Sequence, residues 1–181
     1  MTTDEELMLQ VRRGSREAFE ALFERYRAAL WRFFRRRVPD PSRAEELTQD
    51  VFLAVLQGSR RYQGRGPVRS YLFGTAYNIL LADRRKTSTR RTSVLDDDVA
   101  ASASDPDHGL WVRKALAQLD PDDRELLMLR EYDQLSYQEI AHVKGLPLNT
   151  VRSRLFRARM ALKAALESCS ANDLKVTHDS R

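Results

Sequence analysis

The chain has 181 residues, a formal net charge of +5 and 42% hydrophobic residues, enough for one or two small domains with packed cores. Its single cysteine, Cys169, excludes an intrachain disulfide framework and a cysteine-based zinc site, and its three histidines lack metal-ligand spacing. There is no apolar run of about 20 residues, and the acidic start TTDEE is unlike a signal peptide. These features predict a soluble, cytoplasmic protein with no metal or cofactor, and the positive charge suggests an anionic partner.

The N-terminal part of the chain is predicted to be helical throughout. Thr3 and Ser15 are each placed to cap a helix, and apolar residues recur at helical spacing after both. Ser42 and Glu45 have the spacing of a capping box at the start of a third helix. The four predicted helices cover residues 3–12, 15–37, 42–58 and 68–86.

Residues 87–109 lack this periodicity and are rich in Ser, Asp and Ala. Such a segment buries too little apolar surface to offset its ordering entropy, so we expect a flexible acidic linker. Helical patterns return over residues 110–168, where Asp120 and Pro121 are typical of a helix start, and the tail 169–181 shows no pattern. The sequence therefore predicts an all-α protein with two small helical domains, residues 1–86 and 110–168.

The second domain contains a predicted helix-turn-helix between residues 136 and 163. Ser136 and Glu139 form a capping-box pattern, and Gly145-Leu146-Pro147 ends that first helix in a tight turn. The second helix opens near Asn149, and its predicted buried side consists of Val151, Leu155 and Leu162. Its charged side chains are all basic: Arg152, Arg154, Arg157, Arg159 and Lys163. A basic second helix of this kind can enter the major groove of DNA.

Both domains resemble the extracytoplasmic-function (ECF) sigma factors of the sigma-70 family. The first domain resembles their region 2 in AFEALFERYRAALWRFFRRRV, AEELTQDVFLAVLQ and YQGRGPVRSYLFGTAYNILLADRRK. The second resembles their region 4 in LDPDDRELLMLREYDQLSYQEIAHVKGLPLNTVRSRLFRARMAL. The resemblance implies a non-enzymatic subunit that directs RNA polymerase core to specific promoters and initiates DNA-templated transcription. It further implies −35 duplex readout, capture of the −10 strand, and an anti-sigma factor as a partner.

The exposed side of the second helix carries groups that suit base edges. An arginine can form two hydrogen bonds with guanine, and an apolar side chain can contact a thymine methyl group. The resemblance implies −35 recognition by Asn149, Thr150, Arg152, Ser153, Phe156 and Arg157, with Arg130 on the DNA backbone. Arg154 and Arg159 are instead interpreted as solvated or paired with acids such as Glu131.

The region around residues 62–78 mixes aromatic rings, arginines and an amide. Rings can stack on unpaired bases while guanidinium groups hold phosphates, so the mixture suits single-stranded DNA. The resemblance implies −10 recognition by Tyr62, Arg65, Arg69, Tyr71 and Asn78. Two residues depart from the family's pattern, because Tyr71 replaces its usual Trp and Gly74 its usual Arg. The alternative is that Tyr71, Phe73 and Tyr77 are core side chains, which we expect for at least one of them.

The sequence of residues 44–56 predicts a helix with an acidic and polar face. This face consists of Glu46, Gln49 and Asp50, with Phe52 as an aromatic anchor. Such a face can dock on a basic partner helix. The resemblance implies that the partner is the clamp-helices coiled coil of the largest polymerase subunit. A solvated amphipathic helix is the alternative.

Two other classes of protein fit parts of the pattern. An ordinary transcriptional regulator would sense a signal or dimerise through its N-terminal helices and bind duplex DNA without polymerase. An adaptor would bind core or an anti-sigma partner without recognising a promoter, and Gly74 keeps this alternative open. An enzyme is disfavoured, because no nucleophile, paired carboxylates or phosphate loop stands out.

Overall fold

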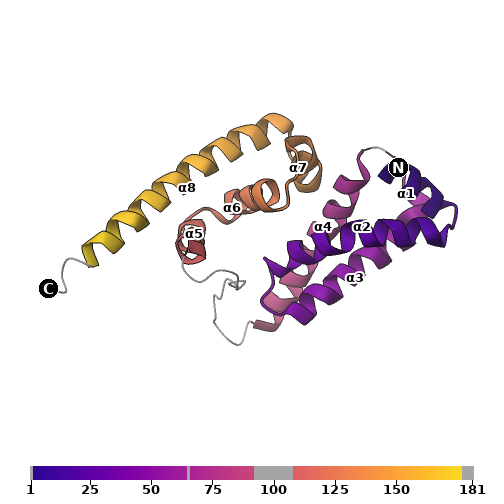
Figure 1. Ribbon diagram of the computed structural model, residues 1–181, viewed down its shortest axis with the longest axis horizontal. Coiled ribbons are helices and arrows are strands. Elements are labelled where there is room, and N and C mark those ends of the chain that lie inside the picture. The colour runs from indigo at the N-terminus through magenta and orange to yellow at the C-terminus, as the bar shows by residue number, and fades with distance from the viewer. Residues whose placement is uncertain (1, 65, 92–107, 177–181) are drawn as a thin grey trace. The chain divides into compact units, whose positions relative to one another are not determined.

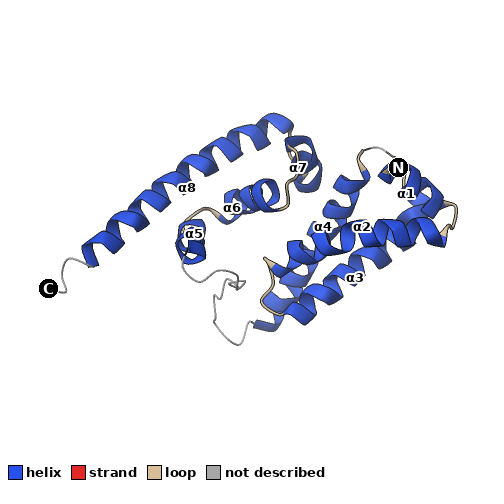
Figure 2. Cartoon of the chain, viewed as in Figure 1, coloured by secondary structure: helices blue, strands red, loops and turns tan. Residues whose placement is uncertain are grey.

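A computed structural model describes residues 2–64, 66–91 and 108–176, and within these the chain forms helices and loops but no strand (Figures 1 and 2). The helices divide between two compact units, one built largely from α1 to α4 and the other from α5 to α8. The predicted all-α fold with two helical units is confirmed. None of the described helices combines the length and apolar character needed to cross a membrane. Of the predicted linker, residues 92–107 lie outside the described residues.

The first unit contains α1 (Asp4–Arg12), α2 (Arg16–Arg35), α3 (Pro41–Gly58), the short 3-10 helix η1 (Ser59–Arg61) and α4 (Val68–Arg91). Helix α2 packs on α1 and α3, and α4 packs on α3. The core is formed by apolar residues at helical spacing, including the fully buried Leu30, Leu47 and Leu72. The buried Phe33 ring lies edge-on to the rings of Phe34 and Phe73, at centroid distances of 5.1 and 5.8 Å.

The helix starts follow the capping rules, with one correction. Thr3 caps α1 through a capping box with Glu6, and Ser15 caps α2. The predicted box of Ser42 and Glu45 is wrong. Asp40 caps α3 instead and accepts a hydrogen bond from the Ser42 N–H at 2.9 Å. The reason is Pro41, which favours the first helical position and so moves the cap to the residue before it.

The second unit contains α5 (His108–Ala117), α6 (Pro121–Leu127), the π-helical turn η2 (Met128–Tyr132), α7 (Tyr137–Lys144) and α8 (Leu148–Val176). Asp120 caps α6, as the sequence predicts, and α5 and α6 pack against α8. Buried apolar residues from these helices form the core, among them Leu126, Leu129, Ile140, Val151 and Leu155.

Three helices extend into segments that were predicted to be linker or tail. Helix α4 continues to Arg91, past the predicted end at residue 86, and α5 begins at His108. Helix α8 continues past Ser168 to Val176, and residues 177–181 lie outside the described residues. The extensions past residues 86 and 168 contain no Gly or Pro, so no residue there stops either helix.

Candidate nucleic-acid interface

The helix-turn-helix is built by local sequence signals at its turn. The main-chain N–H of Glu139 donates to Ser136 Oγ at 3.2 Å, and the Ser136 N–H donates to Glu139 Oε2 at 2.7 Å. The predicted capping box of α7 is therefore confirmed. Gly145 adopts φ +63°, and the N–H of the next residue, Leu146, donates back to the Ala141 carbonyl at 3.0 Å. This closed turn fixes where α8 begins.

Helix α8 has one buried and one exposed face. Val151, Leu155 and Ala158 are buried, and Leu162 is half-buried. The opposite face presents the predicted −35 residues: Asn149, Arg152, Ser153, Phe156 and Arg157 are exposed, and Thr150 is half-buried beside them. The Phe156 side chain is 66% exposed, and the exposed Met160 follows one turn later. The structure thus brings the predicted groups onto a single solvent-facing surface, which we call the reading face.

The remaining arginines of α8 are held by acids of the protein, which is one of the two interpretations that the sequence left open for them. Arg159 donates to Glu131 Oε1 at 2.8 Å and to the Tyr137 hydroxyl at 3.0 Å. These two hydrogen bonds raise the pKa of the Arg159 guanidinium above its ordinary value. Arg154 is paired with acids at the start of α6. Arg152 and Arg157, by contrast, have no ion-pair partner among the described residues, so their charge is available to DNA.

Arg130 has a local role in addition to the predicted one. Its Nη1 donates to the Leu135 carbonyl at 2.9 Å, and its guanidinium carbon lies 5.2 Å from the centre of the Tyr137 ring. These contacts close the turn between η2 and α7, where Gln134 adopts φ +55°. The contact of Arg130 with the DNA backbone stays a prediction. The guanidinium N–H groups that do not bond the Leu135 carbonyl would have to make that contact.

The aromatic residues predicted to capture the −10 strand are less exposed than the sequence suggested. Tyr62 is only 8% exposed, its ring packs 5.2 Å from the Tyr71 ring, and its hydroxyl donates to the Gly66 carbonyl at 3.2 Å. This burial contradicts the predicted stacking role of Tyr62, because a base needs an open ring face. Phe73 is buried in the core, which confirms the core interpretation for that residue.

Tyr71 is the half-buried ring of this region. Its burial raises the pKa of the phenol above the ordinary value, so the side chain stays neutral at physiological pH. A Cβ at position 58 would lie 2.9 Å from the Tyr71 hydroxyl, so glycine there leaves room for the ring. Arg69 precedes it by two residues on α4, and the Arg69 guanidinium carbon lies 5.6 Å from the centre of the Phe73 ring. Asn78 is exposed, and Arg65 lies outside the described residues.

Helix α1 holds both ends of the loop before α4, which the sequence interpretation missed. Arg12 Nη1 donates to the Tyr62 carbonyl at 3.4 Å, and the Val68 N–H donates to Glu5 Oε1 at 3.4 Å. Burial, and then the nearby Glu5 carboxylate, raise the pKa of the Tyr62 phenol. The sequence contained one signal for a shared contact surface of these two residues. Glu5 and Arg12 are seven residues apart and therefore lie on the same side of the helix.

The polar residues of the predicted docking face on α3 are exposed, whereas its predicted aromatic anchor is buried. Glu46, Gln49 and Asp50 are exposed. Phe52 is 4% exposed and packs against the rings of Phe19 and Phe23, at centroid distances of 6.2 and 4.7 Å. It therefore supports the helix from within and offers no surface to a partner.

Leucines take the place of Phe52 on this face. Leu53 follows Asp50 by three residues and is 55% exposed, and Leu56 follows Leu53 by three more and is also exposed. Asp50 and Leu53 also line a groove of about 360 Å³ between α3 and α4. The α3 face, defined as Glu46, Gln49, Asp50, Leu53 and Leu56, is thus both apolar and acidic.

Comparison with known proteins assigns both units to one family. Residues 22–90 match Sigma-70 region 2, and residues 109–162 match Sigma-70, region 4. The RNA polymerase sigma-H factor of Pseudomonas aeruginosa is 30% identical, with 91% of this chain and 94% of that protein covered. The ECF RNA polymerase sigma factor SigC of Mycobacterium tuberculosis is 32% identical, with 89% and 90% covered. The chain belongs to the ECF sigma factors of the sigma-70 family.

A solved structure extends the likeness to three dimensions. The sigma factor RpoE of Bartonella quintana, in complex with the anti-sigma factor NepR, has a TM-score of 0.67 and 26% identity. That comparison covers 82% of this chain and 96% of RpoE. The protein is therefore an RNA polymerase sigma factor that acts in promoter-specific transcription initiation.

The surfaces described above fall within the two matched regions of the sigma factor. The reading face of α8 lies inside the region 4 match, and the α3 face and the half-buried Tyr71 lie inside the region 2 match. Helix α1, whose Glu5 and Arg12 contact the loop before α4, precedes the region 2 match. Helix α1 itself thus lies outside the matched segment, and Tyr62 and Val68, which it contacts, lie inside it.

Proposed function

We propose that the second unit, residues 110–168, binds the −35 element as duplex DNA through the reading face of α8. The observation that carries this proposal is the pairing pattern of the arginines on α8. Arg154 and Arg159 are neutralised by acids, whereas Arg152 and Arg157 are exposed beside the uncovered Phe156 ring. On such a face an arginine can form two hydrogen bonds with guanine, and the edge of the phenylalanine ring can contact a thymine methyl group. Arg130 would add a contact to the DNA backbone.

The first unit, residues 1–86, would capture the −10 strand with the loop before α4 and the start of that helix. Tyr71 is the stacking ring in this proposal, Arg69 holds a phosphate, Asn78 bonds a base edge, and Arg65 adds charge. Tyr62 and helix α1 support the loop from beneath. The family usually has an arginine at the position of Gly74. Because glycine offers no side chain to the DNA there, we expect the affinity for the −10 strand to be lower than is usual for the family.

The α3 face would dock on RNA polymerase core, at the clamp helices of the largest subunit. Its acidic groups suit a basic coiled coil, and the exposed Leu53 and Leu56 provide apolar area that such an interface can bury. Core would supply the catalysis, so this subunit would be no enzyme itself. Because the segment between α4 and α5 joins them, the two DNA-binding units would raise each other's effective concentration on one promoter. An anti-sigma factor is a further partner, by likeness to the RpoE–NepR complex.

Run-off transcription by purified bacterial RNA polymerase core on a randomised promoter pool, with and without this protein, tests the proposal. We expect transcripts that depend on the protein and share two spaced upstream motifs. Core binding without transcripts would indicate an adaptor. Tight duplex binding with neither core binding nor transcripts, on a core shown to be active with another sigma factor, would indicate a free-standing regulator.

A further inference from the structure

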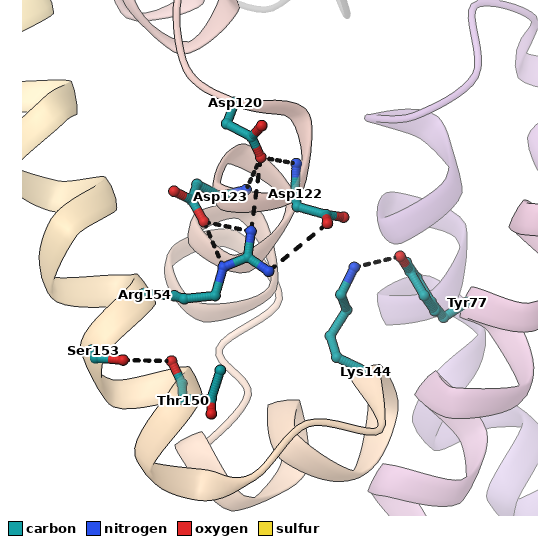
Figure 3. A network of polar contacts seen from close by, with 8 residues as sticks. All are labelled: Tyr77, Asp120, Asp122, Asp123, Lys144, Thr150, Ser153 and Arg154. Carbon is teal, nitrogen blue, oxygen red and sulfur yellow. Dashed lines mark hydrogen bonds and ion pairs between the residues drawn. The ribbon is translucent and has the colours of Figure 1, made fainter.

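We infer that Arg154, whose guanidinium is paired with acids of α6 at the edge of the reading face, sets the orientation of α8 and is thereby a positioning residue for −35 specificity. The inference rests on the proposed −35 function of α8. Its basis is a cluster in which three carboxylates from the start of α6 surround one guanidinium of α8 (Figure 3).

The distances in this cluster show one tight pair and two looser ones. Arg154 Nε donates to Asp123 Oδ1 at 2.8 Å, and its Nη2 lies 2.7 Å from the same oxygen. The other two carboxylates lie further from the guanidinium, Asp120 at 3.7 Å and Asp122 at 3.8 Å. The Arg154 and Asp123 side chains are 21% and 23% exposed, so water screens this pair less than a surface pair. Asp123 is therefore the main partner of Arg154.

The carboxylates are positioned by the helix start itself. Asp120 caps α6 and accepts hydrogen bonds from the N–H groups of Asp122 and Asp123, at 3.0 and 3.4 Å. The cap therefore fixes the first turn of α6, and with it the Asp123 side chain. Arg154 links this fixed turn to α8 across the packed interface between the two helices. The ion pair joins two rigid elements, which is what a positioning contact requires.

A second pair acts on the other side of α8. Because a helix turns about 100° per residue, Arg154 and Arg159 lie on opposite flanks of the stripe formed by Val151, Leu155 and Ala158. Arg159 is held by Glu131 of η2. A rotation of α8 about its axis in either direction would break one of the two pairs. The pair of Arg154 is the less exposed of the two, since the side chains of Arg159 and Glu131 are 43% and 54% exposed.

The orientation of α8 determines the direction in which the side chains of the reading face point. Thr150 lies one turn before Arg154, and Arg157 lies about one turn after it. Ser153, which is adjacent to Arg154, donates its hydroxyl to the Thr150 carbonyl at 3.1 Å and thus belongs to the same turn (Figure 3). Hydrogen bonds to base edges depend on distance and angle, so a small rotation of α8 would weaken them while leaving phosphate contacts largely intact.

The alternative is that Arg154 leaves the acids and binds a DNA phosphate directly. The two explanations give opposite results for Asp123→Asn. If Arg154 orients α8, removal of its main partner weakens specific binding, in the same direction as Arg154→Ala. If Arg154 contacts phosphate, Asp123→Asn releases the guanidinium and tightens binding to every sequence. The experiment therefore compares Arg154→Ala, Asp123→Asn and the double variant.

Holoenzymes assembled from full-length variants and core would be titrated onto a selected −35 duplex and onto a scrambled duplex. We expect each single variant to lower the ratio of specific to scrambled affinity about tenfold, the discrimination that roughly one base pair supplies. The double variant should be no worse than Arg154→Ala, and Glu131→Gln, which weakens the more exposed pair, should change the ratio less than Asp123→Asn does. Circular dichroism would establish that each variant is folded. If Arg154→Ala does not fold, the inference is tested with Asp123→Asn alone.

Tighter binding by Asp123→Asn, or an unchanged ratio in both single variants, would overturn the inference. An equal loss of affinity for both duplexes with Arg154→Ala would overturn it as well, since that is the result for a phosphate contact. These outcomes are separate from failure of the proposed function, in which the wild-type holoenzyme itself would not distinguish the two duplexes.

Discussion

Arg157→Ala tests the reading face of α8 most sharply, because the chain contains a matched control two residues away. Arg157 is exposed and has no ion-pair partner among the described residues, whereas Arg159 is bonded to Glu131 at 2.8 Å. A guanidinium forked on guanine contributes about 1–3 kcal/mol of discrimination, so Arg157→Ala should weaken binding to the −35 duplex about 5- to 150-fold. Arg159→Ala removes an exposed ion pair and should cost at most about 1 kcal/mol.

Fluorescence anisotropy of a labelled promoter duplex with the holoenzyme, from about 50 to 200 mM salt, would measure both effects. If Arg157 binds a base edge, its removal lowers affinity and relaxes the preference at one base position, with little change in salt dependence. If Arg157 binds a phosphate instead, its removal lowers the salt slope by about 0.9 and leaves sequence preference intact. Equal effects of Arg157→Ala and Arg159→Ala would refute the division of the α8 arginines into DNA-facing and protein-facing groups.

Three further predictions concern the other parts of the molecule. Asp50→Lys should abolish binding to core while circular dichroism stays native-like, and normal core affinity would contradict the role of the α3 face. Gly74→Ala should stabilise the first unit by about 1 kcal/mol, since a Cβ there meets no atom within 4 Å, and thermal unfolding would detect an increase. Ser136→Ala should destabilise the second unit by about 1 kcal/mol, because α7 loses the hydrogen bond to the Glu139 N–H. An unchanged urea midpoint would count against that capping contribution.

The features that could be predicted from the sequence are those in which a residue acts within its own helix or turn. The capping box of Ser136 and Glu139, the turn at Gly145 and the buried stripe of α8 depend on spacings of a few residues. The pairing of Arg159 with Glu131, 28 positions away, was one of two interpretations that the sequence left open, the other being a solvated side chain.

The features that could not be predicted depend on how the helices pack. Phe52 and Leu53 are adjacent, and the packing of α3 against α2 buries the phenylalanine and leaves the leucine exposed. A helical wheel offers a partial signal, because Leu53 shares a face with Asp50 and Phe52 does not. The burial of Tyr62 depends in the same way on the Tyr71 ring and on contacts with α1, which its local sequence does not specify.

The most direct test of the account compares promoters selected from a randomised pool by holoenzymes carrying wild type, Arg152→Ala/Arg157→Ala and Tyr71→Ala. The wild type should select two motifs at a fixed spacing. The double arginine variant should lose the upstream motif and keep the downstream one, and Tyr71→Ala should do the reverse. Loss of both motifs in either folded variant, or retention of both in all three holoenzymes, would contradict the assignment of −35 and −10 recognition to these two surfaces.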